Sequence, residues 1–331
     1  MSNYNNASPL KPVSERDSLA KALTKMKARR QGKLPSLITG WPKFNDAFCD
    51  GLEWKTITVI GARPGTGKTL FMEQLISDII EKNPDEKFRV LKFQMEMVDE
   101  TNGIRKFSLK TGSDYNTLMS KGGDLVDKEI WNKCVQYYNS TQTKDIVNVV
   151  YDQCTISEFE ATIAYEQERY KEDGVYPNML VSIDHSALFA VDKYEKDKFD
   201  MLGHLGEALT RLKKKYPIAF VVLSQLNRNV EDPRRAEDGS YGNYILDSDI
   251  YGSDALLQHA DVLIGINKPA NRRIRLYGPE KFVIEDPETL VFHFLKSRNG
   301  TTKISFFKLD RKTMRIEQMD VPAQAVKISI K

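Results

Sequence analysis

The sequence has little cysteine and no long apolar run. Its three cysteines are far apart and odd in number, which argues against both a disulfide framework and a zinc site. No stretch reaches the roughly 18 apolar residues that a membrane-spanning helix needs, and the polar N-terminus lacks the apolar core of a secretion signal. With 40% apolar and 29% charged residues, we expect a globular protein of a reducing compartment without membrane contact. The cysteines are Cys49, Cys134 and Cys154.

The sequence also lacks a large excess of one charge. Its net charge of +3 is too small to indicate nucleic-acid binding by itself. Positive charge is nevertheless concentrated in residues 11–33, which hold eight Lys or Arg against Glu15 and Asp17. Asn, Ser and Pro dominate residues 1–14, which we expect to be disordered.

A helix is predicted to follow from Ser14, because Leu19, Leu23 and Met26 fall on one face. Gly32 and the proline that soon follows would end it. The apolar face is too narrow to form a core of its own. We therefore expect the helix either to dock on another surface or to present a solvated basic face.

Short apolar runs alternate with helical segments along the rest of the chain. This alternation predicts an α/β fold with a mostly parallel central sheet flanked by helices, closed by a C-terminal antiparallel hairpin. The predicted strands are Lys55–Gly61, Arg89–Phe93, Asp145–Tyr151, Asn178–Ile183, Ile218–Ser224, Ala260–Asn267, Thr289–Leu295, Ile304–Leu309 and Met314–Gln318.

A phosphate-binding loop stands between the first of these strands and a helix. In such a loop successive backbone N–H groups surround the β-phosphate, a lysine reaches the β- and γ-phosphates, and a Thr hydroxyl binds Mg²⁺. The pattern predicts ATP and Mg²⁺ as cofactors, with Lys68 and Thr69 in these two roles. One departure is that Ala62 replaces the first Gly of the strict motif, with Gly61 just before it. The loop residues are Ala62, Arg63, Pro64, Gly65, Thr66, Gly67, Lys68 and Thr69.

Three polar residues follow other predicted strands. Asp184 directly follows a buried strand, where a carboxylate faces the ligand crevice of an α/β sheet and can hold Mg²⁺ through water. Glu96 could polarise an attacking water, and Gln225 at a strand tip could sense a γ-phosphate. From position alone, Glu96 and Gln225 could equally be ordinary surface residues.

Taken together, these segments resemble the RecA-like motor domain of DnaB-type hexameric replicative helicases, from about Asp17 to Gln318. The resemblance implies that Glu96 is the catalytic base and Gln225 the γ-phosphate sensor. It also implies that Lys296 and Arg298 reach the nucleotide of the neighbouring subunit as a finger. The matching segments are GARPGTGKT (61–69), FQMEM (93–97), SIDHSALF (182–189), LSQLNR (223–228), DSDIYGSDALLQHAD (247–261) and KSRNG (296–300).

The resemblance further implies an ATP-dependent helicase that hydrolyses nucleotide at subunit interfaces. It would translocate 5′→3′ on single-stranded DNA as a homohexamer, in the cytoplasm of a bacterial or phage-infected cell, with a primase or helicase loader as a further partner. DNA would contact two channel loops, although the lysines in them could also be solvated surface. The DNA-binding residues would be Arg228, Lys193, Lys196, Lys198, Tyr251, Gly252 and Ser253.

The implied division has four parts: a disordered segment 1–14, a linker helix 15–34 that packs on the neighbouring subunit, an ATPase domain 35–319 and a tail 320–331. We expect a motor without the family's N-terminal collar domain, since only about forty residues precede the core. Leu276–Glu288 departs from the family pattern and is expected to form a polar hairpin. A RecA-like recombinase and an ATP-gated adaptor or loader without unwinding activity remain alternatives.

Overall fold

The computed structural model describes residues 11–33, 36–96, 99–121, 126–140, 146–193, 195–251 and 256–325. The chain divides into two units, Met1–Ser36 and Leu37–Lys331. Parts of the predicted segments 1–14 and 320–331, and the predicted DNA-binding residues Gly252 and Ser253, lie outside the described residues.

The first unit contains one described helix, α1 (Glu15–Arg30). It begins where the Ser14 side chain accepts a hydrogen bond from the backbone N–H of Asp17. Its apolar stripe is largely uncovered, since Leu19, Leu23 and Met26 are 59%, 66% and 66% exposed. The helix thus forms with an apolar face that buries little surface.

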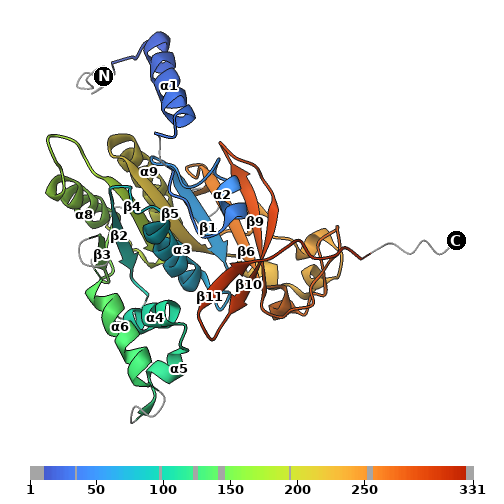
Figure 1. Ribbon diagram of the computed structural model, residues 1–331. Coiled ribbons are helices and arrows are strands. Elements are labelled where there is room, and N and C mark those ends of the chain that lie inside the picture. Colours follow the sequence, from blue (N-terminus) through green and yellow to red (C-terminus); the bar gives the residue numbers. More distant parts are fainter. Residues whose placement is uncertain are drawn as a thin grey trace. The chain divides into compact units, whose positions relative to one another are not determined.

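In the described part of the second unit, nine strands form one sheet in the order β11-β10-β9-β6-β1-β5-β4-β2-β3 (Figure 1). The strands from β6 to β3 in this order pair in parallel, and β9, β10 and β11 add antiparallel pairs at one edge. The strands are β1 (Ile57–Ala62), β2 (Phe88–Gln94), β3 (Val147–Val150), β4 (Asn178–Asp184), β5 (Ile218–Gln225), β6 (Val262–Asn267), β9 (Thr289–Ser297), β10 (Ile304–Asp310) and β11 (Arg315–Gln318).

Helices cover both faces of the sheet (Figure 1). Successive strand residues alternate between two cores: Val59 packs in the core that contains α8 and α9, whereas Ile60 packs in the core that contains α2 and α3. Burial of each large apolar side chain contributes about 1.5–3 kcal/mol. The helices are α2 (Pro42–Asp46), α3 (Lys68–Lys82), α4 (Asp99–Thr111), α5 (Tyr115–Leu118), α6 (Lys128–Asn139), α8 (Ile156–Arg169) and α9 (Lys198–Lys215).

Short 3₁₀ turns between Arg228 and Asp249 and a two-stranded hairpin form a satellite core beside β9 and β10. The hairpin pairs β7 (Leu276–Tyr277) with β8 (Phe282–Val283), which confirms the hairpin predicted in Leu276–Glu288. Its predicted polar character is wrong, because Tyr277 and Phe282 are buried in the satellite core. Backbone bonds from Val283 to Ala323 and from Ala325 to Lys281 hold the start of the C-terminal tail beside β8.

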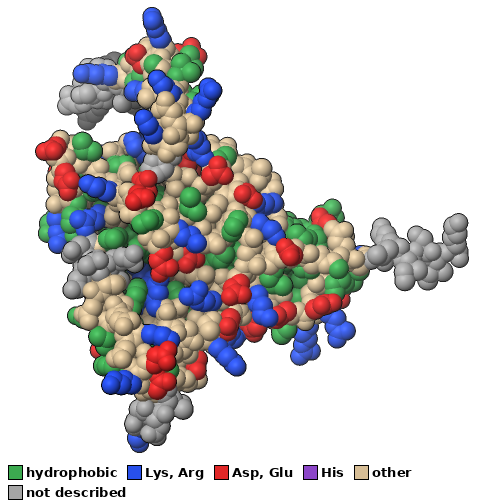
Figure 2. All heavy atoms as spheres, viewed as in Figure 1, with side chains coloured by type: hydrophobic (Ala, Val, Ile, Leu, Met, Phe, Trp, Pro, Cys, Tyr) green, Lys and Arg blue, Asp and Glu red, His purple; other side chains and the backbone are tan. Residues whose placement is uncertain are grey.

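The described helices include none with the length and apolar character to span a membrane. On the face of the molecule in Figure 2, basic and acidic side chains are interspersed over the second unit. Nucleic-acid binding would therefore depend on particular loops rather than on a broad basic field on this face.

Candidate nucleotide site

The phosphate-binding loop is built by the backbone between β1 and α3. Gly65 and Gly67 have φ angles of 75° and 96°, in the left-handed region that glycine adopts without strain. Gly67 is the N-cap of α3, so the first N–H groups of that helix have no intrahelical acceptor and can bind a phosphate. Ala62 is fully buried at the end of β1, so its contribution is its backbone: its carbonyl oxygen accepts a hydrogen bond from Lys68 Nζ at 3.2 Å.

Lys68 and Asp184 place opposite charges at the carboxyl end of the sheet. Burial lowers the pKa of Lys68, although Asp184 and Glu96 oppose that shift. Burial likewise raises the pKa of Asp184 to about 6, helped by the nearby Glu96 and opposed by a hydrogen bond from Thr69 and by Lys68. A buried carboxylate of this kind is costly unless a cation or a donor completes its surroundings.

The residues at this point fit Mg²⁺. Asp184 is 3% exposed, and its Oδ1 is buried without a hydrogen-bond partner beside the Thr69 hydroxyl. Mg²⁺ prefers oxygen ligands and is usually held by one or two protein groups together with phosphate and water oxygens. The described residues contain no cluster of three or more His, Cys, Asp or Glu able to hold a metal.

A pocket of about 520 Å³ opens beside the loop. It brings together residues from Pro64 to Leu70 with Glu96 and Gln225. From their positions in the sequence alone, these two residues could have been ordinary surface residues. The volume of the pocket lies in the range of small-ligand sites. Two arginines that the sequence analysis missed also line it: Arg105 on α4 and Arg311 after β10. Neither stands in a motif, and only the fold brings them to the loop.

Gln225 is oriented by the residue that follows Asp184. Its Nε2 lies 3.3 Å from Nε2 of His185. Burial lowers the pKa of His185, and its Nδ1 accepts a hydrogen bond from the backbone N–H of Ala187, which leaves Nε2 facing the Gln225 amide. The side chain of Gln225 is thereby held at the pocket that Glu96 also lines.

Lys296 and Arg298 lie at the opposite end of the sheet. β9 runs antiparallel to β6, so Ser297 pairs with Val262 at the amino end of β6. The phosphate loop follows the carboxyl end of β1, which is parallel to β6, and a strand of this length spans roughly 20 Å. Lys296 and Arg298 therefore cannot reach the phosphate loop of their own chain.

Both residues predicted to form the finger are held by local contacts at that end. Lys296 Nζ donates to the carbonyl oxygen of Leu257 at 2.9 Å. Arg298 lies 3.3 Å from a carboxylate oxygen of Asp261 and keeps a side chain that is 52% exposed. An exposed guanidinium on a fixed backbone is available to a second molecule.

The predicted DNA-binding lysines lie in the loop after β4 and at the start of α9. Lys198 Nζ donates to the carbonyl oxygen of Ala187 at 2.7 Å, and the backbone N–H of Lys196 donates to Asp200. The backbone N–H of Lys193 donates to Asp192. The lysines thus share one loop, with Lys198 turned back toward the protein.

The other two described DNA-binding candidates lie beside the tip of β5. Tyr251 donates its backbone N–H to the carbonyl oxygen of Gln225 at 2.8 Å. Arg228 is exposed at the start of the 3₁₀ turn Arg228–Glu231. Both are therefore close in sequence or space to the pocket residue Gln225.

A buried polar network behind the site also escaped the sequence analysis. Glu73 on α3 is 5% exposed and accepts hydrogen bonds from Lys92 and Gln94 of β2 and from Lys106 of α4. Asn102 in turn donates to Gln94. Glu73 therefore ties the helix of the phosphate loop to the strand that leads to Glu96, and no local sequence signal reveals this link.

Comparison with known proteins identifies a family. The family model described as DnaB-like helicase C terminal domain matches residues 36–318, which confirms the resemblance seen in the motifs. The replicative DNA helicase DnaB of Helicobacter pylori (strain J99 / ATCC 700824) is 23% identical over 250 residues, 75% of this chain and 47% of that protein. The DnaB of Buchnera aphidicola subsp. Baizongia pistaciae is 26% identical over 275 residues, 82% and 54% of the two chains. The chain thus spans about half the length of these relatives.

Solved structures share the fold. The ATPase domain of G40P superposes with a TM-score of 0.77 at 15% identity, covering 94% of this chain and all of that one. A DnaB-like replicative helicase, described together with its interactions with primase, gives a TM-score of 0.75 at 16% identity, covering 94% and 68%. These matches confirm the predicted RecA-like α/β fold with its mostly parallel sheet and antiparallel C-terminal strands.

Proposed function

Because the chain belongs to the DnaB-like helicase C-terminal domain family, we propose that it is the motor of an ATP-dependent DNA helicase. The motor moves 5′→3′ along single-stranded DNA as a homohexameric ring in the cytoplasm. One observation supports the ring: the phosphate loop and the Lys296–Arg298 segment lie at opposite ends of one sheet. A complete hydrolysis site then requires two copies of the chain.

Five side chains at or beside the pocket have roles in hydrolysis. Lys68 neutralises the β- and γ-phosphates, and Thr69 and Asp184 hold Mg²⁺, which offsets phosphate charge when bound. Glu96 orients the attacking water and accepts its proton. Gln225, held by His185, contacts the γ-phosphate through its amide.

Arg298 and Lys296 of one copy complete the site of its neighbour. Charge that develops on the transferred phosphoryl group is stabilised by a guanidinium placed in trans, and such a finger is worth about 10³–10⁵-fold in rate. This arrangement makes hydrolysis depend on assembly. The 52% exposed Arg298 side chain is suited to that contact.

The linker helix α1 supplies a second contact between copies. An apolar groove of about 590 Å³ lies among α4, α5 and α6, lined by Ile104, Phe107 and the 62% exposed Trp131. Leu19, Leu23 and Met26 of α1 have the spacing of three or four residues by which helices bind such grooves. In the proposed ring, α1 of one copy docks on this groove of the next.

A forked duplex with single-stranded tails tests the activity. With ATP and Mg²⁺, the protein separates the strands when a 5′ tail is present, and the Lys68→Ala variant does not. DNA-stimulated hydrolysis without strand separation would indicate that the chain needs a loader or partner, or, if an added loader does not restore separation, that it is a recombinase. Hydrolysis that DNA does not stimulate would indicate an adaptor, and adding a primase or helicase loader to the same assay tests those partners.

Mixing two inactive variants tests the trans arrangement. Arg298→Ala and Lys68→Ala are each expected to lose ATP hydrolysis while keeping a wild-type thermal transition. In mixed rings, an intact loop from the first variant meets an intact finger from the second, so hydrolysis returns in part. If the mixture stays inactive, or if Arg298→Ala alone keeps wild-type turnover, the finger assignment is wrong.

A further inference from the structure

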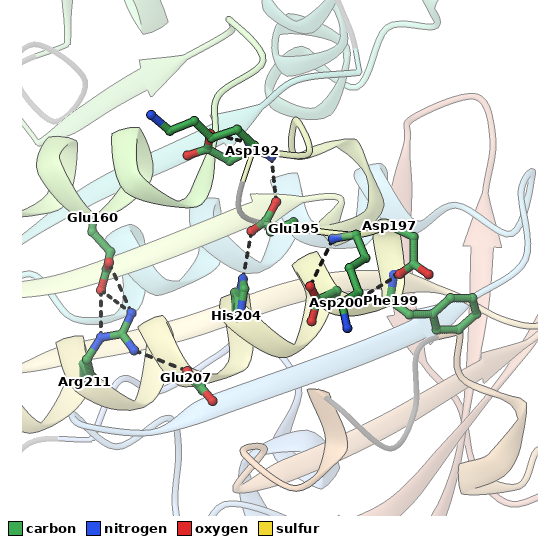
Figure 3. Close-up of polar contacts among 11 residues, drawn as sticks. Glu160, Asp192, Glu195, Asp197, Phe199, Asp200, His204, Glu207 and Arg211 are labelled. Carbon is green, nitrogen blue, oxygen red and sulfur yellow. Dashed lines mark hydrogen bonds and ion pairs between the residues drawn. The ribbon is translucent and has the colours of Figure 1, made fainter. Parts of the chain in front are cut away.

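An aromatic pair stands at the end of the sheet where nucleotide binds. Phe199 in the first turn of α9 is 57% exposed, and its ring centroid lies 5.3 Å from that of Tyr251, with the ring planes tilted by 36°. The two residues come from different loop regions of the chain, one after β4 and one after β5. Figure 3 shows Phe199 standing out from the start of α9, away from the contacts of His204 and Arg211 farther along the helix.

We infer that Phe199 and Tyr251 form a stacking platform for the bases of single-stranded DNA. The inference rests on the proposed function and adds base contacts to the phosphate contacts considered so far. Aromatic side chains beside cationic groups are the usual means of holding single strands without sequence preference, because every base has a π-face. Because Phe199 is 57% exposed, a DNA base can stack on its ring beside Tyr251.

The charges around the pair favour a polyanion as its occupant. Lys196 and Lys198 precede the Phe199 ring in the chain, and Arg228 is exposed three residues beyond Gln225. The nearby carboxylates are turned toward their own backbone: Asp197 accepts from the N–H groups of Phe199 and Asp200, and Asp200 accepts from Lys196 (Figure 3).

The Glu195 carboxylate is engaged as well. It accepts from the backbone N–H of Asp192 at 2.8 Å and lies 3.2 Å from Nδ1 of His204. Its side chain is 3% exposed. The loop before Phe199 is therefore held on α9 by its acidic residues, and the exposed Lys196 side chain remains to meet the phosphates.

The platform is also joined to the nucleotide site. The backbone N–H of Tyr251 donates to the carbonyl oxygen of Gln225, whose side chain lines the ATP pocket. The Ser224 hydroxyl donates to the carbonyl oxygen of Tyr251 at 3.4 Å. A displacement of Gln225 during hydrolysis would move Tyr251 directly, which gives the motor a way to shift a stacked base.

Two probes of equal length separate base stacking from phosphate binding: a 20-nucleotide oligo(dT) and an abasic sugar-phosphate chain. Affinities are measured by fluorescence anisotropy with the full chain, Mg²⁺ and a non-hydrolysable ATP analogue. Loss of one stacked base weakens binding roughly tenfold. We expect Phe199→Leu, which keeps an apolar contact with Tyr251, to bind oligo(dT) roughly tenfold more weakly and the abasic chain as tightly as the wild type.

Controls fix the interpretation. Phe199→Tyr keeps a ring and should restore oligo(dT) affinity, and Tyr165→Leu removes an aromatic side chain of similar exposure on α8 and should change neither affinity. If Phe199→Leu weakens both probes equally, or neither, the platform is wrong and the helicase proposal stands. If the wild type binds neither probe, both proposals fail.

Discussion

Two aspartates at opposite ends of the sheet are buried to a similar degree but are surrounded differently. Asp184, at the carboxyl end of β4, is 3% exposed and has a carboxylate oxygen without a hydrogen-bond partner. Asp261, just before the amino end of β6, is 8% exposed and accepts from the backbone N–H of Ile57 at 2.8 Å and from Lys213 at 2.5 Å. Arg298 adds a third positive or donor group.

The difference separates a ligand site from a structural one. An unsatisfied buried oxygen costs free energy in the isolated protein and is retained where a ligand completes it. A saturated carboxylate stabilises the chain that contains it. The sequence shows an acidic residue beside an apolar run in both places, so only the contacts tell the two apart.

The largest expected effect comes from replacing the unsatisfied carboxylate. Asp184→Asn should lower ATP hydrolysis by about 10²–10³-fold, because a Mg²⁺ ligand is lost. Without nucleotide, the free energy of unfolding should stay the same or rise by about 1–3 kcal/mol, since a buried charge is removed. Phosphate release and urea denaturation measure the two quantities, and a large loss of stability would contradict this interpretation of Asp184.

Glu73 sharpens the comparison, because it is buried near the ligand end of the sheet but saturated. Burial alone would raise its pKa, but Lys92 and Lys106 outweigh that and hold the pKa at about 2. Its stabilising contribution is therefore complete above pH 4.5 and is lost as the pH falls toward 2, a total of about 3 kcal/mol.

The matched variant Glu73→Gln should lose about 3 kcal/mol of stability at pH 7, because the lysine ammonium groups remain buried beside it. Urea denaturation between pH 3 and pH 7 is the measurement. The wild type should lose stability below pH 4.5 more steeply than the variant. Parallel pH profiles for the two proteins would show that Glu73 is not the group responsible.

The smallest effect is expected at the saturated aspartate. Asp261→Asn should cost about 1.5–3 kcal/mol of unfolding free energy, the usual value of hydrogen bonds that involve a charged group. Nucleotide affinity should be unchanged, because the phosphate loop is at the other end of the sheet. Urea denaturation measures the stability, and binding of a fluorescent ATP analogue measures the nucleotide affinity. Weaker nucleotide binding at unchanged stability would contradict the structural role of Asp261.

Much of the fold follows from sequence because strands buried on both faces appear as continuous apolar runs. Each of the nine predicted strands has a counterpart among the described residues. The helix α2 and the turns between Arg228 and Asp249 were not predicted, because such short segments show no apolar periodicity. Their positions are set by packing on the sheet.

The sequence by itself determined the phosphate loop, since its glycines, Lys68 and Thr69 are contiguous and their chemistry depends on local backbone geometry. Tertiary structure decided which residues join that loop. It brings Glu96, Arg105 and Gln225 to one pocket and carries Arg298 to the far end of the sheet. The reason is physical: strand order and strand direction decide which side chains from distant parts of the chain meet, and no local sequence pattern encodes that order.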